Sequence, residues 1–279
     1  MITTSKSLRL IACTPTTHTR PLFVFLPGMD GSGALLRPQI AGLSSSFDIR
    51  CLSIPPDDLT GWDDLAEQVG TLIRMEQQQH PGRPTTVCGE SFGGCLALKL
   101  ITRFPDLCDQ IILVNPASSA QRQPWISACC SLTQLLPTSL YYLSTFSLCD
   151  LLIATHRVSR PSRQQLLAAM QAVRPKSAAW RLSLLRQFRL DDLPLGRVLQ
   201  PVLILASGAD SLLPSKREAK RLARYLPNAT TFLLPDSGHA CLLESQLNLS
   251  AILKSHDRCA DVGISIRPMS AAAQPAACL

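Results

Sequence analysis

The segment Gly89-Glu90-Ser91-Phe92-Gly93-Gly94 constrains the fold of this chain more than any other. It follows the short apolar run 85–88 and comes directly before a helical pattern over 95–102. A G-x-S-x-G turn between a strand and a helix strains the backbone of its serine, so the residues two before and two after it must lack bulk. The strain lifts the serine hydroxyl above the sheet edge, where a histidine can reach it. We therefore expect Ser91 to be a nucleophile.

A glycine-rich loop follows an apolar strand that we expect over residues 22–26. The loop reads Pro27-Gly28-Met29-Asp30-Gly31-Ser32-Gly33. In an acyl-transfer enzyme such a loop gives one backbone N–H to the oxyanion, and the residue after the nucleophile gives another. A phosphate-binding loop would end in Gly-Lys-Ser/Thr, and no lysine is present. The predicted oxyanion donors are the N–H groups of Met29 and Phe92, and a plain turn is the alternative.

An aspartate follows the buried strand that we expect over residues 201–206. Asp210 lies just beyond the carboxyl end of this strand, where a parallel sheet places its functional groups. The alternative is that it only caps the helix expected from Pro214. Asp210 falls between the serine and the histidine, which is the Ser…Asp…His order of one large architecture. After the preceding strand, 110–114, the corresponding position holds Asn115, which cannot act as an acid.

The last predicted strand, 229–234, leads into a loop that ends at His239. A histidine in that loop can reach over the sheet edge and take the proton of Ser91, while Asp210 fixes its tautomer. Asp236 is so close to His239 in the chain that it is better suited to shaping the loop, and it is kept as a second candidate acid. The remaining histidines follow no sheet strand and are interpreted as surface residues: His18, His80, His156 and His256.

Strand and helix patterns alternate from residue 22 to residue 114, with a crossover helix over 62–79, which predicts a parallel sheet flanked by helices. From Pro116 to about residue 199 the pattern is helical and broken by prolines, and then the alternation resumes. We expect an α/β fold with an inserted helical cap. The predicted division is an N-terminal extension (1–21), a core (22–116 and 200–255), the cap (117–199) and a disordered tail (256–279).

The cap carries the excess charge of the protein. Residues 117–199 contain ten basic and three acidic side chains, a difference of +7 that equals the net charge of the whole chain. Residues 124–149 contain no charged side chain, but Pro137 and many serines and threonines argue against a membrane span. We expect two short amphipathic helices there. Their aromatic residues would line an acyl pocket, lie in a membrane interface, or simply pack between helices: Trp125, Tyr141, Tyr142 and Phe146.

This combination suits an anionic lipid surface or an acidic acyl carrier as partner, and no nucleic-acid-binding motif accompanies the charge. The eleven cysteines form no C-x-x-C pair, and Cys88 and Cys95 are expected to be buried apolar fillers, which suits a reducing compartment. Residues 1–20 hold no long apolar run of a secretory signal. We expect an intracellular protein, cytoplasmic or peripheral on an internal membrane, without cofactor, metal or transmembrane helix.

The chain resembles the α/β-hydrolases, and more closely the hydrolase part of the phytyl ester synthase/diacylglycerol acyltransferase family of plastids and cyanobacteria. The resemblance rests on residues 25–33, on residues 89–98 with Asn115-Pro116-Ala117, and more weakly on residues 51–55. It implies transfer of fatty acyl groups from lipids or acyl thioesters, such as those of coenzyme A or acyl carrier protein, to lipophilic alcohols such as phytol or diacylglycerol.

The plastid proteins of that family also carry a C-terminal acyltransferase domain with a His-x4-Asp motif, which we do not find in this sequence. Decarboxylative or C–C-cleaving chemistry on the same fold is a minor alternative. The two main interpretations stay open, because they share every catalytic residue. Either the serine-hydrolase core transfers acyl groups alone, with water excluded from a capped pocket, or the protein is a lipase, esterase or thioesterase with water as acceptor. A binding protein without catalysis would be expected to lack a member of the Ser, Asp and His set, and none is missing.

Overall fold

The computed structural model describes residues 7–16, 19–126 and 137–261, without the side chains of 257–261. Its centre is a seven-stranded sheet in the order β1-β3-β2-β4-β5-β6-β7, in which only β1 runs antiparallel to its neighbour. The strands are β1 (Arg9–Ala12), β2 (Leu22–Leu26), β3 (Asp48–Ser53), β4 (Thr85–Glu90), β5 (Gln110–Val114), β6 (Val202–Ser207) and β7 (Ala229–Leu234). The predicted α/β class and its mostly parallel sheet are confirmed.

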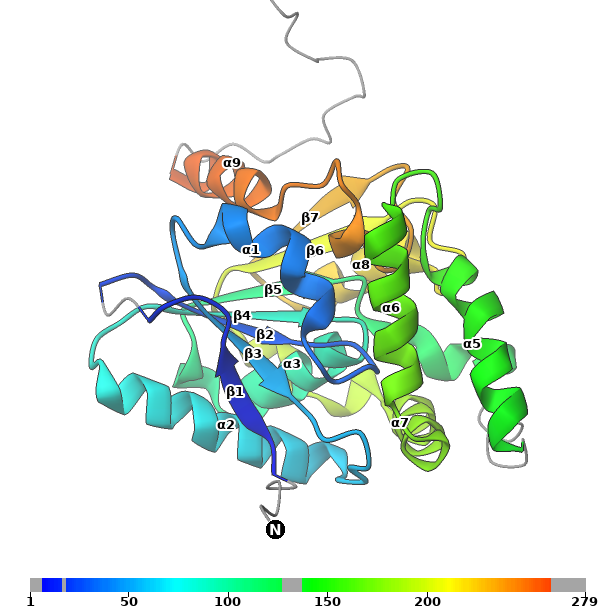
Figure 1. Cartoon of the computed structure of the whole chain (residues 1–279). Helices are drawn as coiled ribbons and strands as arrows, with labels where there is room; N and C mark the ends of the chain where they lie inside the picture. Colours follow the sequence, from blue (N-terminus) through cyan, green and yellow to red (C-terminus); the bar gives the residue numbers. More distant parts are fainter. Residues whose placement is uncertain (1–6, 17–18, 127–136, 262–279) are drawn as a thin grey trace, which may run out of the picture.

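Helices cover both faces of this sheet (Figure 1). The described helices are α1 (Arg37–Leu43), α2 (Trp62–Gln79), α3 (Phe92–Arg103), α5 (Thr138–Leu152), α6 (Arg160–Ala172), α7 (Pro175–Gln187), α8 (Ser215–Tyr225) and α9 (Leu249–Asp261). Side chains of α2, α3 and α8 share one hydrophobic cluster with one face of the sheet. Those of α1 and α9 share a second cluster with the other face. The core is therefore two apolar layers with the sheet between them.

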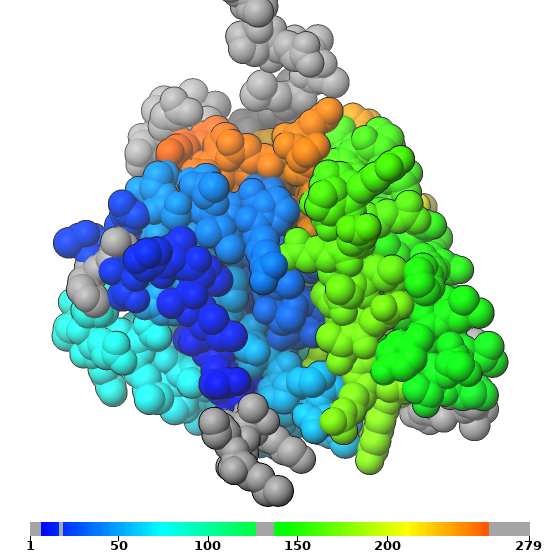
Figure 2. Space-filling view, viewed as in Figure 1, coloured from blue at the N-terminus to red at the C-terminus, as the bar shows by residue number. Residues whose placement is uncertain are grey.

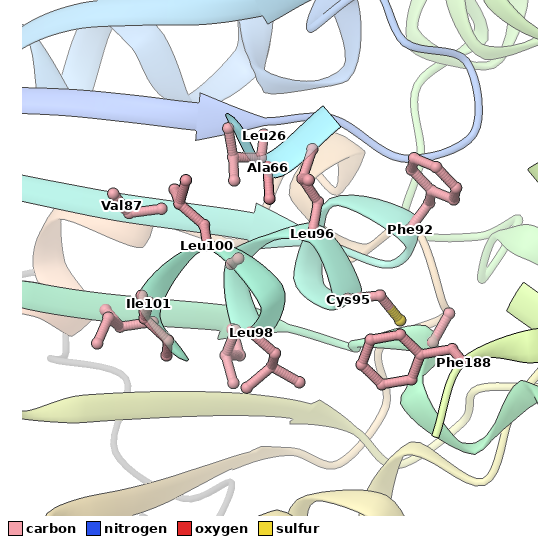
Figure 3. Close-up of a cluster of buried hydrophobic side chains, with 14 of the residues drawn as sticks. Leu26, Ala66, Val87, Phe92, Cys95, Leu96, Leu98, Leu100, Ile101 and Phe188 are labelled. Atoms are coloured by element: carbon pink, nitrogen blue, oxygen red, sulfur yellow. The ribbon is translucent and has the colours of Figure 1, made fainter. Parts of the chain in front are cut away.

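The central strands are buried along their whole length because helices lie on both sides of them. Every residue of β2, β4 and β6 is buried, as continuous apolar runs in a parallel sheet predict. Figure 3 shows side chains of α3, among them Leu96 and Leu100, beside Leu26 of β2 and Val87 of β4. Cys95 belongs to this cluster and Cys88 to the opposite one, and both are fully buried, as expected of apolar fillers.

Helices α5, α6 and α7 come between β5 and β6 in the chain, and residues 137–190 cover one side of the molecule (Figure 2). We call these residues the α5–α7 segment. Two indole N–H groups connect it to α2 and the loop before α2. Trp180 donates to the Thr60 carbonyl (3.0 Å), and Trp62 donates to the Leu184 carbonyl (2.9 Å). The boundaries of core and cap stay a prediction, and residues 127–136, part of the uncharged run, lie outside the described residues.

Two elements differ from the expectations at the ends of the chain. Strand β1 lies within the N-terminal extension as an edge strand paired with β3. Helix α9 continues to Asp261, so residues 256–261 are helical where a tail was expected. The buried side of α9 begins with Leu249 and Leu253, one turn apart in the cluster with the sheet, and continues past the expected boundary to His256. His256 is buried in this helix, which corrects its interpretation as a surface residue. Residues 262–279 lie outside the described part.

None of the helices in the described residues is both long enough and apolar enough to cross a bilayer.

Candidate active site

Ser91 lies in the sharp turn between β4 and α3, with φ 53° and ψ −110°. This left-handed conformation is the strained one that the motif predicts for its serine. The flanking glycines are required by close backbone contacts. A Cβ atom on Gly89 would lie 2.3 Å from the Gly93 carbonyl oxygen, and one on Gly93 would lie 2.0 Å from the Leu26 carbonyl oxygen. The absence of two side chains therefore lets α3 begin directly against the ends of β2 and β4.

The structure brings Ser91, His239 and Asp210 into one hydrogen-bonded chain. His239 Nε2 lies 2.8 Å from Ser91 Oγ, and His239 Nδ1 lies 2.7 Å from Asp210 Oδ2. The side chains of His239 and Asp210 are almost completely buried, whereas Ser91 is partly exposed. Asp236, the second candidate acid, is an exposed residue of the loop, and Nδ1 of the histidine is already bonded to Asp210. The arrangement therefore has its acid on the loop after β6.

Asp210 is held by three further hydrogen bonds. Its Oδ1 accepts from the backbone N–H groups of Leu212 (2.8 Å) and Leu213 (2.9 Å), and its Oδ2 accepts from the Ser215 hydroxyl. Burial acts to raise the pKa of Asp210, but the charge of His239 and these hydrogen bonds outweigh it and hold the pKa below its ordinary value. Asp210 therefore also holds the loop that leads into α8, but it does not cap the helix, because the N-cap residue is Pro214 and no side chain accepts a capping hydrogen bond there.

The loop that carries His239 is organised by Glu244, a buried residue that the sequence analysis did not select. Its carboxylate accepts from the Gly238 N–H (2.9 Å) and the Ser237 hydroxyl (2.8 Å). Arg157, from the loop between α5 and α6, donates to the same carboxylate at 2.6 Å. A buried carboxylate with three donors is well compensated, and it fixes the turn just before the histidine.

Asn115 is a second organising residue that the sequence analysis had only excluded as an acid. Its Nδ2 donates to the His239 carbonyl (2.7 Å) and to the Ser207 hydroxyl (2.8 Å), and its Oδ1 accepts from the Ser207 N–H (2.8 Å). Like Ser91 it has a positive φ, 43°. The signal in the sequence was a lone amide directly after a buried strand, at the position where an acid can stand.

Residues 27–33, which we call the oxyanion loop after their predicted role, pass beside Ser91. A Cβ atom on Gly28 would lie 3.8 Å from Ser91 Cβ. The loop is folded by a hydrogen bond from the Gly31 N–H to the Gly28 carbonyl (3.0 Å) and is joined to the end of β3 by one from the Ile54 N–H to the Gly31 carbonyl (2.8 Å). Phe92 is the first residue of α3, so its N–H has no partner within the helix. The position of both predicted donors next to the serine suits an oxyanion hole.

Arg181 of α7 reaches this loop from the α5–α7 segment. Its Nη1 donates to the Met29 carbonyl (2.6 Å) and its Nη2 to the Pro55 carbonyl (2.9 Å). Only 2% of the residue is exposed, so it does not belong to the basic surface that the composition of the cap suggested. Burial lowers the pKa of Arg181, and the carboxylates of Asp30 and Asp58 oppose that effect.

Two carboxyl groups, the buried Glu90 and the partly exposed Asp30, lie near the site without forming part of the hydrogen-bonded chain. Glu90, directly before the serine, is 2% exposed, and neither of its oxygens has a hydrogen-bond partner among the described residues. Burial, with a smaller contribution from the charge of Asp30, raises the pKa of Glu90 to about 8. Burial also raises the pKa of Asp30, although hydrogen bonds from Ser32 oppose it. Glu90 is therefore predominantly neutral at pH 7.

The four aromatic residues expected at an acyl pocket lie in different environments. Phe146 is 52% exposed and Trp125 38% exposed. Tyr141 is buried, packs edge-on against Tyr142 and donates to the Val173 carbonyl (3.3 Å). The exposure of Phe146 and Trp125 argues against their lining a closed pocket, and the packing alternative describes Tyr141. The acyl pocket as a whole stays a prediction.

Within the described ranges no group of three or more His, Cys, Asp or Glu side chains is arranged to hold a metal ion.

A sheet of this order, with a serine at a strand–helix elbow and a histidine after the last strand, defines an α/β-hydrolase, a class of serine enzymes. Solved structures show the same fold. An esterase from Exiguobacterium antarcticum has a TM-score of 0.73 at 18% identity, covering 90% of this chain and 94% of its own. MenH from S. aureus has a TM-score of 0.68 at 17% identity, covering 90% and 97%.

The chain belongs to the α/β-hydrolase family described as serine aminopeptidase, S33, whose model matches residues 57–246. It is 33% identical to phytyl ester synthase 1, chloroplastic, of Arabidopsis thaliana over 88% of this chain, which confirms the resemblance seen in the motifs. That match covers 38% of the plant protein, so the chain spans about two fifths of its length. It is 26% identical to a pimeloyl-[acyl-carrier protein] methyl ester esterase of Nitrosomonas europaea, over 82% of this chain and 92% of the esterase.

Proposed function

We propose that the protein transfers fatty acyl groups from a lipid or acyl-thioester donor to a lipophilic alcohol, through an acyl-Ser91 intermediate. The observation that carries this proposal is the hydrogen-bonded chain from Asp210 through His239 to Ser91, in a protein 33% identical to a phytyl ester synthase. Phytol is the acceptor to test first, because the name of that relative specifies a phytyl ester. Diacylglycerol is tested beside it, because the family resemblance implies it as an alternative acceptor.

In the proposed reaction His239 Nε2 takes the proton of Ser91 as the serine oxygen attacks the acyl carbonyl. The negative charge that develops on the carbonyl oxygen is stabilised by the N–H groups of Met29 and Phe92. His239 then returns the proton to the departing alcohol or thiol, and the acyl-serine remains. The acceptor alcohol gives its proton to His239 and attacks the ester carbonyl. As the acyl–serine bond breaks, His239 passes that proton to the Ser91 oxygen, and the new ester leaves. Asp210 keeps Nδ1 protonated throughout and stabilises the imidazolium.

Hydrolysis is the second candidate, because water can replace the alcohol in the last step without any change in the protein groups. The similarity to the methyl ester esterase, which spans nearly the whole of that relative, favours it. The two reactions differ only in the acceptor, so the products decide between them.

The deciding experiment is product analysis by mass spectrometry. The purified protein is given galactolipid and acyl-coenzyme A donors with phytol and diacylglycerol, beside a Ser91→Ala control. We expect phytyl ester or triacylglycerol that disappears in Ser91→Ala, while the melting temperature of that variant stays near that of the wild type. Free fatty acid as the sole serine-dependent product would replace acyl transfer by hydrolysis. Undiminished turnover in Ser91→Ala would contradict both.

We further propose that the exposed face of α5 contacts an anionic membrane surface, where a lipid substrate would be collected. Four apolar residues of this helix are 47–63% exposed: Leu140, Leu143, Phe146 and Leu151. The one charged residue of α5, Asp150, is paired with Arg163 of α6 (2.6 Å). Apolar residues bordered by cations are typical of helices that lie in a membrane interface.

Exposed cations border both ends of that helix. Arg160 and Arg163 begin α6, close to the C-terminal half of α5 through the pair with Asp150. At the other end, the hydrogen bond from Tyr141 to Val173 places the start of α5 beside Arg174 and Lys176. Because these groups are solvent-exposed, we expect their attraction for anionic lipid to weaken with salt.

Sedimentation with vesicles tests the α5 surface. The double variant Leu143→Ser/Phe146→Ser should lose most of its binding to phosphatidylglycerol-containing vesicles, and Arg174→Gln/Lys176→Gln should lose the salt-dependent part. Met75→Ser on α2 is the matched control, because Met75 is as exposed as Phe146 (53% against 52%). Unchanged binding of the apolar double variant, or an equal loss in Met75→Ser, would contradict this surface.

A further inference from the structure

We infer that Arg181 is a positioning residue of the active site, which holds the oxyanion loop in its working conformation from helix α7. The hydrogen bonds of Arg181 go to main-chain carbonyls of Met29 and Pro55, and not to the serine or the histidine of the site. It rests on the proposed role of Ser91 as nucleophile, but not on whether the acceptor is an alcohol or water.

The geometry around Met29 carries the inference. The Met29 N–H belongs to the same peptide group as the Gly28 carbonyl. That peptide group is held in place because the Gly28 carbonyl accepts a hydrogen bond from the Gly31 N–H (3.0 Å). The next peptide group is fixed by the Met29 carbonyl, which accepts from Arg181 Nη1 (2.6 Å). The two peptide planes on either side of the Met29 Cα are thus both held, and rotating the N–H away from the site would break one of these bonds.

The second half of the guanidinium anchors this arrangement to the sheet. Nη2 donates to the Pro55 carbonyl (2.9 Å), just after β3, so one planar group bridges two loops. A guanidinium is a rigid fork with donors at fixed angles, and therefore it sets the separation of the two carbonyls. The backbone bond between Ile54 and Gly31 lies beside it and joins the same loops (2.8 Å). A lysine, with its single compact charge, cannot reproduce this bridge.

The packing around the guanidinium is as specific as its hydrogen bonds. Burying a charged group is costly unless hydrogen bonds compensate it, and Arg181 is 2% exposed with two main-chain carbonyls as acceptors. Gly31 has φ +68°, and a Cβ atom there would lie 2.9 Å from Nη1. A side chain at position 31 would therefore push the guanidinium away, and the loop leaves just enough room for it.

Holding the oxyanion loop in place matters in catalysis, because the N–H donors of an oxyanion hole must be aligned before the negative charge develops. If the loop moves, the ground-state complex is little affected, but the oxyanion is less well stabilised. Removing the Arg181 bridge should therefore lower kcat much more than it changes KM. A residue that only supports the general stability of the fold would not separate these two parameters.

The experiment measures hydrolysis of p-nitrophenyl butyrate by Arg181→Met and Arg181→Lys. We expect kcat to fall about tenfold or more in Arg181→Met, with KM little changed, and Arg181→Lys to recover only part of the loss. An alkyl trifluoromethyl ketone, which forms a tetrahedral oxyanion adduct with the serine, should bind more weakly in proportion to the fall in kcat/KM. Binding of the product fatty acid should not change.

Trp180→Phe is the matched control, because it removes a hydrogen bond between the neighbouring residue of α7 and the Thr60 carbonyl without touching the oxyanion loop. If it lowers kcat as much as Arg181→Met, the effect is general loosening of α7 and the inference is wrong. The inference is also wrong if Arg181→Met is inactive only because it is unfolded while folded Arg181→Lys has wild-type kcat and inhibitor affinity. Wild-type kinetics in Arg181→Met beside an inactive Ser91→Ala would overturn this inference alone. Activity in Ser91→Ala would instead overturn the proposed function.

Discussion

Asp210 accepts hydrogen bonds from four groups, and only one of them is the histidine. Asp210→Asn keeps the size of the side chain but offers an amide N–H or a weaker acceptor to His239, which favours the wrong tautomer. We expect kcat to fall by about 10³–10⁴, with the protein still folded. The control is Asp236→Asn in steady-state assays, which should retain full activity. A large loss in Asp236→Asn with little loss in Asp210→Asn would move the acid to the loop of the histidine.

Glu90 gives a prediction about pH and stability. Its pKa is about 8 in the folded protein and lies near the ordinary glutamate value when the chain unfolds. Between about pH 4.5 and pH 8 the Glu90 carboxyl is protonated in the folded protein and ionised in the unfolded chain. The contribution of Glu90 to stability is therefore fully present below about pH 4.5 and is lost as the pH rises toward 8. The slope should reach about 1.4 kcal/mol per pH unit at most.

Glu90→Gln should remove this pH dependence, because an amide of the same shape stays neutral. In urea denaturation the variant should exceed the wild type in stability more at pH 8 than at pH 5. Glu67→Gln, on the exposed surface of α2, serves as the control and should show no such difference. An equal effect of Glu90→Gln at both pH values would mean that the carboxyl is ionised in the folded protein.

At the scale of the element, the contact of α3 with the sheet depends on a glycine. Gly93→Ala would place its Cβ 2.0 Å from the Leu26 carbonyl oxygen, closer than any real contact, and the obstacle is main chain that cannot rotate aside. The start of α3 must then move away from β2, and the elbow moves with it. We expect thermal unfolding to show a lower melting temperature and assays to show lost activity.

Gly196→Ala is the matched control for that prediction, because a Cβ on Gly196 meets nothing within 4 Å. It should leave both the melting temperature and the activity unchanged. A Gly93→Ala protein with wild-type activity would show that the elbow tolerates a displaced helix.

For the whole molecule, the parts that the sequence could predict are those with a local pattern. Buried parallel strands are continuous apolar runs, so the bounds of β2, β5 and β7 agree with the expected ones. Glycines on both sides of a serine predict a strained turn, and the order of residues along the chain predicts which aspartate and which histidine lie beside that serine. The proximity of Ser91, Asp210 and His239 was predictable from these patterns and from the rule that parallel strands share one functional edge, whereas their distances and further hydrogen bonds were not.

The remaining parts depend on contacts between distant positions that no local pattern reports. Arg181 is 152 positions from Met29, and Arg157 is 87 positions from Glu244. In the sequence both arginines look like members of a basic surface. Both side chains point into the protein because of how the α5–α7 segment packs, and the spacing of apolar residues along the sequence does not predict that packing. The edge strand β1 was missed for a related reason, since four residues with little burial give almost no alternation.

These two arginines have a consequence for recombination between relatives. Arg181 holds the loop beside the serine, and Arg157 holds the glutamate that shapes the turn before the histidine. The α5–α7 segment is therefore not a module that can be exchanged to change substrate preference while the reaction centre stays intact. A chimaera would have to inherit both cations together with the carbonyls and carboxylate that receive them. We expect substitutions in the α5–α7 segment to be accompanied by substitutions in the loops that it contacts. A chimaera that lacks either arginine should have lower activity than its parents.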